Sequence, residues 1–374
     1  MQTTLDSELS TDIARDVLRA SSDPSIVIVD GSDVRVCVRS GQLQIIDGLN
    51  REQRTRIISK ADRDIRRIVI FAEHGFVTLD AIRFCESQGI AVTQLDRDMK
   101  LIMSSCSVFV SPKLRQMQTI VSAGYLPHVR LETTRTLLSA KLSGQASIAG
   151  DILSRPDIAA SITERCRYID KANDVSAMLG FEGNAARDYW KAWSSVSVRW
   201  NRTKNLPGHW LEPFRGRASG TQNTIVPANR NRSFSEPESG NRAATDPINA
   251  MLNYVYTVAT SETMFSCLVH GLDPDMGFTH VVKSDRHAMA LDFLETVRPA
   301  CDRVILSILS STIDRGWFYE DSYGVVRIMP SLTHIICEQS LTFARLIEPY
   351  VKELVSNLKA VSPVDEPILQ RNAG

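Results

Sequence analysis

The stretch SIVIVDGSDVRVCVRSGQLQIID (25–47) decides the fold of the first part of this chain. Its middle, DVRVCVR (33–39), alternates valine with arginine or cysteine, which is the period-two pattern of a strand with one buried face and one wet face. Ser40-Gly41 supplies a turn, so the residues that follow continue the ladder. RIVIFA (67–72) predicts a further strand. The first hundred residues are therefore expected to be rich in β structure.

The rest of the chain changes period. The pattern predicts a helix over 77–89, with Gly89 as its C-cap, and short strands over 90–96 and 101–105. From Ser111 onward apolar residues recur at i, i+3, i+4 and i+7, which is typical of amphipathic helices. Helices are predicted over 113–123, 131–150, 151–170, 173–199, 247–270, 285–315 and 331–359, and a short helical leader is predicted over 7–20.

These patterns predict an α+β protein with a small β-rich N-terminal domain and a larger all-α C-terminal domain. The first domain spans 1–106, the second spans 107–360, and the tail 361–374 is expected to be disordered. The length of 374 residues is enough for two domains, so the core needs no disulfide or metal to hold it together.

Composition excludes several classes of protein. The chain has 43 Lys plus Arg and 43 Asp plus Glu, so it does not coat nucleic acid by net charge alone, although a local basic patch remains open. Its seven Cys are scattered, odd in number and without a CxxC pair, which indicates reduced thiols and a cytoplasmic location. The polar start predicts no signal peptide, and no apolar run approaches the ~18 residues of a membrane span.

The stretch 201–247 interrupts the helical pattern. It holds five of the fifteen prolines and more cations than acids. One interpretation is a solvated linker. The other is a basic loop that contacts phosphate, with Trp210 and Phe214 available for packing or base stacking. Arg215 and Arg217 are the candidate phosphate contacts in the second interpretation.

Two segments carry acids in apolar surroundings. In AMLGFEGNAARDYWKAWSSV (177–196), Glu182 sits beside an apolar stripe, where a carboxylate is costly unless a cation meets it. An Arg partner or a snorkelling side chain is the simpler explanation. In GLDPDMGFTHVVKSDRHAMALDFLETVRP (271–299), Asp292 and Glu295 are three apart on a predicted helix, and His280 precedes them in a turn-rich loop.

An imidazole beside two carboxylates suits Mn²⁺ as well as Mg²⁺. A lone His in a loop is more often structural, so this spacing alone leaves the metal site open.

Several blocks in order resemble the CRISPR-associated integrase/endonuclease family of spacer-acquisition enzymes (Cas "one"). The blocks that carry the resemblance are DPINAMLNYVYT, GLDPDMGFTH, LDFLETVRP, MLGFEGNAARDYW, AKLSGQ (140–145) and GFVTLDAIRFCESQGIAVTQLDRDMKLI (75–102). The resemblance covers about 25 to 350. The chain departs from the family pattern mildly: Thr279 stands where Leu is common, and the 201–247 loop is longer and more basic.

The resemblance implies a set of site residues. The family's metal ligands correspond to Glu182, His280 and Glu295, and Asp292 corresponds to a neighbouring acid that supports or shares the metal site. Arg286 corresponds to a basic residue placed to meet phosphate, and Tyr189 to an aromatic near the scissile phosphate.

It also implies an activity and partners. The family joins a 3′-hydroxyl of a short DNA fragment (the prespacer) to the repeat of a CRISPR array with Mg²⁺ or Mn²⁺, and with water as the nucleophile it acts as a nuclease. The expected partners are double-stranded DNA, a second copy bound through the N-terminal domain and a small companion protein (Cas "two"). A local DNA track is expected from the 201–247 cations and from Lys113, Arg115, Arg130, Arg135 and Lys141.

Three alternatives remain. One is a transposase-like relative, which usually carries an extra C-terminal helix-turn-helix that the ~25 residues after Pro349 are too few to supply. The others are a branched-DNA repair nuclease and a DNA-binding scaffold without catalysis.

Overall fold

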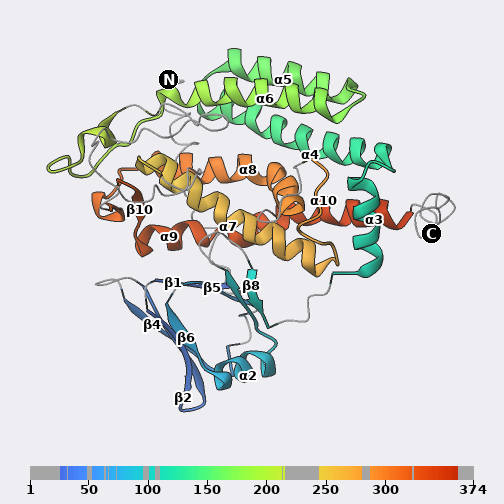
Figure 1. Cartoon of the computed structure of the whole chain (residues 1–374). Helices are drawn as coiled ribbons and strands as arrows, with labels where there is room; N and C mark the ends of the chain where they lie inside the picture. Colours follow the sequence, from blue (N-terminus) through green and yellow to red (C-terminus); the bar gives the residue numbers. More distant parts are fainter. Residues whose placement is uncertain are drawn as a thin grey trace, which may run out of the picture.

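A computed structural model describes 26–31, 33–48, 53–62, 65, 67–72, 74–95, 101–105, 110–212, 214, 244–279, 287–321 and 324–360. Within these residues a β-rich part is followed by a larger helical part (Figure 1). The predicted α+β class is therefore confirmed. The last strand of the β-rich part ends at Ser104 and the next helix begins at Pro112, on either side of the domain boundary expected near 106.

Among the described residues, the β-rich part contains two four-stranded sheets and one helix. In the first sheet the order is β1-β5-β7-β8, with β8 antiparallel to the rest. In the second sheet the order is β4-β3-β2-β6, and β2 pairs in parallel with β6. The elements are β1 (Ile26–Gly31), β2 (Val34–Arg39), β3 (Gln42–Asp47), β4 (Arg54–Ile58), β5 (Arg67–Ala72), β6 (Gly75–Val77), α2 (Leu79–Ser87), β7 (Ala91–Leu95) and β8 (Leu101–Ser104).

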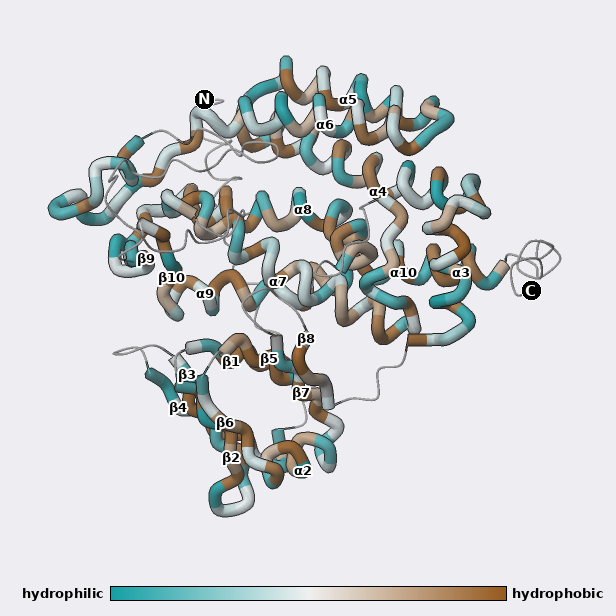
Figure 2. Tube along the Cα trace, in the orientation of Figure 1, coloured by the Kyte–Doolittle hydropathy of each residue, from teal (hydrophilic) through white to brown (hydrophobic). Residues whose placement is uncertain are grey.

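The first sheet is buried on both faces. Val27 and Val29 of β1 pack into the core of the β-rich part, whereas Ile28 packs into the core of the helical part. This is why β1 and β5 are nearly continuous apolar runs, drawn mostly in hydrophobic colours in Figure 2, while β2 alternates. The sheet therefore forms the wall between the two parts.

The helical part is built around α4, α7 and α8, with α5 and α6 forming an outer layer above α4 (Figure 1). Its elements are α3 (Pro112–Ser122), α4 (Pro127–Ser147), η2 (Ile148–Ile152), α5 (Pro156–Lys171), α6 (Val175–Ala192), η3 (Trp193–Ser195), η4 (Gly208–Leu211), α7 (Pro247–Val269), α8 (Ala288–Leu309), η5 (Arg315–Trp317), β9 (Phe318–Glu320), β10 (Val326–Ile328), α9 (Pro330–Cys337) and α10 (Ser340–Ala360).

Local signals explain several helix ends. Asp246 caps α7 by accepting a hydrogen bond from the Asn249 backbone N–H at 2.9 Å, and Pro247 occupies the first turn. Gly89 follows the C-cap of α2 with a φ of 68°, the left-handed region that glycine adopts without strain. The start of α7 agrees with the sequence-based expectation, whereas the C-cap of α2 is Gln88, one residue before the expected Gly89.

Besides shifts at the ends of several helices, the structure differs from the expectation at four places. The helix expected over 331–359 is two helices, α9 and α10, which are interrupted after Cys337. The helical part also contains a hairpin of β9 and β10, and the strands β4 and β6 were not expected. The leader over 7–20 and the tail 361–374 lie outside the described residues.

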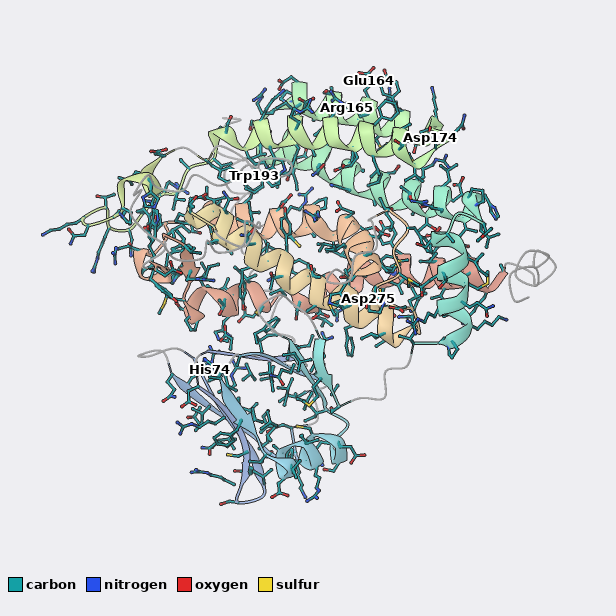
Figure 3. The ribbon with its side chains drawn as sticks, in the orientation of Figure 1. His74, Glu164, Arg165, Asp174, Trp193 and Asp275 are labelled. Carbon is teal, nitrogen blue, oxygen red and sulfur yellow. The ribbon has the colours of Figure 1, made fainter. Side chains whose placement is uncertain are left out.

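The aromatic residues of the 201–247 stretch are buried. Trp210 stacks on Trp200 with ring centroids 5.8 Å apart, and Phe214 packs against Trp193 at the end of α6 (Figure 3). Base stacking by Trp210 and Phe214 is therefore wrong for this structure, because their rings belong to the core. Arg215 and Arg217 lie outside the described residues.

Two further observations bear on the composition. The six cysteines within the described residues are all free. Among the same residues, none of the helices combines the length and the apolar character needed to cross a bilayer.

Candidate metal centre

Glu182 and Glu295 approach a single cation although they come from different helices. Lys141 of α4 forms an ion pair with Glu182 of α6, and its Nζ lies 2.5 Å from Oε2 of Glu295 on α8. All three side chains are largely buried, with 9%, 17% and 6% of the side-chain surface exposed for Lys141, Glu182 and Glu295. Arg298 adds a second cation, with Nε 3.1 Å from Oε1 of Glu295.

The two carboxylates, Glu182 and Glu295, thus face two cations, Lys141 and Arg298. Burial alone lowers the pKa of Lys141, but the carboxylates of Glu295 and Glu182 outweigh burial and raise the pKa above its ordinary value. The ammonium stays charged. Carboxylate oxygens are the donors that a hard divalent ion prefers, and two carboxylates converge here on one positive centre, so these residues fit such an ion.

Asp292 holds the backbone that leads into His280. Its Oδ2 accepts hydrogen bonds from the backbone N–H of Phe278 at 2.6 Å and of Thr279 at 3.0 Å. The side chain is 1% exposed. His280 itself lies outside the described residues, and so does Arg286. The structure thus gives Asp292 a contact with the loop before His280.

The same loop is also held from two other helices, α3 and α4. The Gln118 side chain on α3 accepts a hydrogen bond from the Asp273 backbone N–H at 2.8 Å, and its Nε2 donates to the Asp273 carbonyl at 2.9 Å. From α4, Arg130 donates to the Phe278 carbonyl at 2.8 Å. The Thr134 hydroxyl, also on α4, lies 3.1 Å from the Thr279 hydroxyl of the loop. Thr279, which departs from the usual Leu, therefore has a polar partner.

Gly277 allows the loop to lie against the start of α8. A Cβ at Gly277 would lie 2.6 Å from the backbone carbon of Ala288, closer than real Cβ contacts. The backbone N–H of Met289 donates to the Pro274 carbonyl at 2.9 Å. Nδ1 of His287 lies 2.6 Å from Oδ1 of Asp275, which Figure 3 labels beside α7. The turn-rich GLDPDMG sequence thus fixes where the chain enters the segment that contains His280.

Tyr189 does not face solvent. Its side chain is fully buried, and its hydroxyl donates to Oδ2 of Asp302 at 2.8 Å, while the Tyr256 hydroxyl donates to the other oxygen. Burial, together with the nearby carboxylate of Asp302, raises the pKa of Tyr189 well above its usual value, so the phenol stays protonated. The expected contact between Tyr189 and DNA is therefore wrong for this structure, in which the residue packs the core.

Several cations expected in the DNA track have internal partners instead. Lys141 is buried between the two carboxylates, and Arg130 holds the Phe278 carbonyl. Arg135 donates to the Ala172 carbonyl at 2.7 Å, and Nε of Arg115 lies 3.0 Å from Asp273. Lys141 is the site residue whose role the sequence analysis missed. The signal was its position, since Leu137, Leu138 and Leu142 around it are buried core residues.

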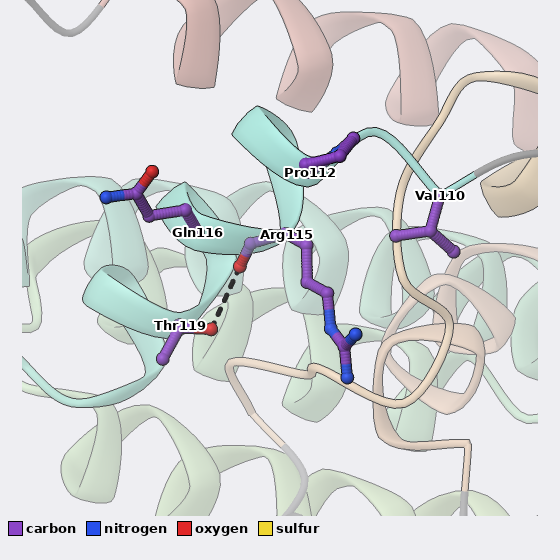
Figure 4. Close-up of a pocket in the computed structure, with 5 residues that line it drawn as sticks. All are labelled: Val110, Pro112, Arg115, Gln116 and Thr119. Carbon is purple, nitrogen blue, oxygen red and sulfur yellow. Dashed lines mark hydrogen bonds between the residues drawn. The ribbon is translucent and has the colours of Figure 1, made fainter.

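A shallow pocket of about 340 Å³ lies along α3 and is lined by Val110, Pro112, Arg115, Gln116 and Thr119 (Figure 4). The Thr119 hydroxyl donates to the Arg115 carbonyl at 2.9 Å. None of these five side chains is a carboxylate, imidazole or thiol, so the pocket offers no metal ligands.

A second polar cluster joins the β-rich part to α9. Asp30, Asp47 and His334 offer ligand atoms within 4.8 Å of one another. A cation already fills this cluster, because Arg54 lies 2.7 Å from Oδ1 of Asp47 and 3.2 Å from Oδ1 of Asp30. Because Asp30, Asp47 and His334 lie outside the motifs that match the family's metal ligands, we interpret the cluster as a polar contact between the two parts of the chain.

His334 should make stability depend on pH. Burial, with Arg54 and Arg56 nearby, lowers the pKa of His334 from 6.5 to about 4, although the carboxylate of Asp47 opposes the shift. The unfolded chain therefore takes up a proton more readily, and this contribution to folding is lost as pH falls from 6.5 to 4. The full effect is at most about 3 kcal/mol. Burial raises the pKa of Asp30, which acts in the opposite direction.

The contribution of His334 is the difference in unfolding free energy between wild type and His334→Gln, followed as a function of pH. Urea denaturation of wild type and His334→Gln at several pH values should show wild type losing stability relative to the variant between pH 6.5 and 4. His74→Gln, at an exposed position in the β-rich part (Figure 3), serves as the matched control. Parallel curves for wild type and His334→Gln would contradict the assignment.

Solved structures define the class of the fold. A casposase bound to integration product superposes with a TM-score of 0.67 at 22% identity, covering 90% of this chain and 91% of that chain. A Cas1 protein from Thermotoga maritima superposes with a TM-score of 0.61 at 17% identity, covering 90% and 97%. The class is thus the two-part fold that casposase and Cas1 proteins share.

The family follows from the sequence. The model of the family described as CRISPR associated protein Cas1 matches 27–205 and 223–334, so the chain belongs to the Cas1 family. The CRISPR-associated endonuclease Cas1 1 of Archaeoglobus fulgidus is 24% identical over 303 residues, 76% of this chain and 78% of that protein. A Cas4/Cas1 fusion of Geobacter sulfurreducens is 26% identical over 251 residues, and the match spans 40% of the fusion. The resemblance drawn from the sequence motifs is confirmed.

Proposed function

We propose that this protein is a divalent-ion-dependent DNA endonuclease and integrase of CRISPR adaptation, which inserts short DNA at the repeat of a CRISPR array. The observation that carries the proposal is the convergence of Glu182 and Glu295, from α6 and α8, on one positive centre. Membership of the Cas1 family and the endonuclease relatives support the activity.

Glu182, Glu295 and His280 are the residues that would hold Mg²⁺ or Mn²⁺. When bound, such an ion supplies Lewis-acid activation of the attacking hydroxyl and stabilises charge on the phosphate oxygens. The chain itself holds the two carboxylates on rigid helices and anchors the loop before His280 through Asp292. His280 acts as a neutral imidazole in this arrangement.

The reaction is a phosphodiester exchange. The 3′-oxygen of the incoming DNA forms a bond to a phosphorus of the repeat, and the bond from that phosphorus to its original 3′-oxygen breaks, releasing a 3′-hydroxyl. Water in place of the incoming DNA gives hydrolysis. Arg286, Arg215 and Arg217 are the proposed contacts to the DNA backbone, where each neutralised phosphate steepens the salt dependence of binding.

The proposed partners are double-stranded DNA, a second copy of this chain and the companion Cas2. A solved complex of Cas6-RT-Cas1 with Cas2 superposes with a TM-score of 0.60 at 15% identity, covering 91% of this chain and 35% of that chain. The outer face of the second sheet exposes Ile57 (60%) and Phe76 (53%), which supports pairing of two copies through the β-rich part. The free cysteines support a cytoplasmic location.

An integration assay with a supercoiled repeat-bearing plasmid and Mn²⁺ tests the proposal. Glu182→Ala and His280→Ala should each lower strand transfer by about 10³-fold, because each removes a metal ligand. The matched control is Glu164→Ala, which removes an exposed acid of α5 whose carboxylate accepts a hydrogen bond from the Tyr168 hydroxyl (Figure 3). Wild-type integration by Glu182→Ala would refute the metal centre. DNA binding by wild type without strand transfer or cleavage would favour the scaffold alternative.

A further inference from the structure

Lys141 occupies the position between Glu182 and Glu295. Its Nζ lies 2.5 Å from Oε2 of Glu295 and is also paired with Glu182, while the residue is only 7% exposed. A side chain with four rotatable carbons thus places its charged end between two acids that come from two other helices. Lysine is suited to such a position because its ammonium is compact and its stem is flexible.

The charges of the cluster balance with Lys141 in place. Two carboxylates face two cations, Lys141 and Arg298, and Arg298 takes the other oxygen of Glu295. A divalent ion added between the same carboxylates would meet the ammonium at short range, and like charges at this distance repel strongly in a buried site. The ion and the ammonium therefore compete for the same oxygens.

The helix that carries Lys141 is pressed against the helix that carries Glu295. Gly144 lies one turn beyond Lys141, and a Cβ there would lie 2.6 Å from Cβ of Pro299 on α8. This close packing fixes the backbone, so any exchange between ammonium and ion must come from rotation of the lysine side chain. Gln145, four residues after Lys141 and thus on the same face of α4, is 3% exposed and has an Oε1 without a hydrogen-bond donor. A polar group that lacks a donor is a second sign that a ligand or water belongs at this face.

We propose that Lys141 is a displaceable counter-ion. It fills the cation position between Glu182 and Glu295 when no divalent ion is bound, yields that position when the ion enters, and then turns its ammonium to a phosphate of bound DNA. The proposal rests on the metal centre proposed above and adds a positioning residue that links ion binding to DNA binding.

Two consequences follow. Without DNA, Lys141 opposes the ion, so ion affinity is lower than the two carboxylates alone would give. With DNA, the phosphate accepts the displaced ammonium, and each ligand strengthens the binding of the other by the same factor.

Calorimetric titration of the full chain with Mn²⁺, without DNA, tests the competition. Lys141→Met should bind Mn²⁺ at least tenfold more tightly than wild type, because the competing charge is gone. In EDTA the same variant should melt several degrees below wild type, since the two carboxylates then lack the ammonium between them and only Arg298 still pairs with Glu295 among the cations described above. Mn²⁺ should remove this difference in melting temperature. Lys191→Met, which removes an exposed lysine of α6 paired with Asp188, should match wild type in both measurements.

Two more variants make the outcome decisive. Lys141→Arg keeps the charge but carries a bulkier head group, so it should keep the EDTA melting temperature and bind Mn²⁺ at least fivefold more weakly, even if Lys141→Met fails to fold. The double variant Glu182→Gln/Glu295→Gln gives the baseline without a site. A short blunt duplex should tighten Mn²⁺ binding about tenfold in wild type and less in Lys141→Met.

The possible failures are distinguishable. Equal or weaker Mn²⁺ binding by Lys141→Met, above the baseline, would overturn the counter-ion role and leave the metal centre intact. If wild type and Lys141→Met both bind no more Mn²⁺ than the double Gln variant, the metal centre is overturned, and the counter-ion role with it.

Discussion

Glu262→Ala should destabilise the protein by about 3–5 kcal/mol, the cost of leaving a buried charge without its partner. Glu262 on α7 accepts two hydrogen bonds from Arg67 at the start of β5, at 2.6 and 2.5 Å. The side chains are 8% and 1% exposed for Arg67 and Glu262, and the guanidinium lies 4.2 Å from the ring centre of Phe265. Without the Glu262 carboxylate, the Arg67 guanidinium would remain buried between the Phe265 ring and the sheet, with its charge no longer paired to Glu262.

Urea denaturation followed by circular dichroism measures the loss. The double variant Arg67→Met/Glu262→Leu should recover most of it, because apolar side chains of similar size often replace a buried ion pair at little cost. Glu348→Ala is the matched control, since its ion pair with Lys352 on α10 is exposed and such pairs contribute about 0–1 kcal/mol. A midpoint for Glu262→Ala equal to that of Glu348→Ala would show that the pair does not hold the two parts together.

The same pair shows what the sequence could and could not predict. β5 is evident from its apolar run, but the partner of Arg67 lies 195 residues away, and no local pattern connects them. Strands β1, β2 and β3 and most helices were predicted because a period of two or 3.6 is a local property. β4 was missed because its arginines, Arg54 and Arg56, interrupt the apolar pattern, and their partners Asp30, Asp47 and His334 come from other elements.

In the candidate site, too, the sequence indicated single residues but not the contacts between elements that are far apart along the chain. Family motifs identified Glu182 and Glu295, and the structure brings them onto one cation, yet the sequence analysis assigned Lys141 to a DNA track and missed its contact with the two carboxylates. Its charge was evident from the sequence, but its burial depends on how α4, α6 and α8 pack. Tyr189 was misassigned for the same reason, because its partner Asp302 comes from a helix 113 residues away.

Asp292→Ala should lower strand transfer by at least about 100-fold, even though Asp292 contacts backbone in this structure. Its carboxylate accepts the N–H groups of Phe278 and Thr279, the last two residues before His280. Alanine removes the acceptor from the buried N–H of Phe278, at about 1–3 kcal/mol, and from the partly buried N–H of Thr279, so the loop that positions His280 should loosen.

Asp292→Asn separates a positioning role from a direct metal ligand. The amide oxygen of asparagine still accepts both hydrogen bonds, so this variant should keep activity and Mn²⁺ affinity within about tenfold of wild type. If Asp292 binds the ion directly, Asn as well as Ala should instead reduce Mn²⁺ affinity by well over about tenfold, because both remove the charged carboxylate. Hydrogen exchange at 278–279 gives an independent readout: exchange should accelerate in Asp292→Ala and stay near wild type in Asp292→Asn. Since the two substitutions differ in whether an acceptor remains, the ratio of their effects measures how much of the site depends on the anchored loop.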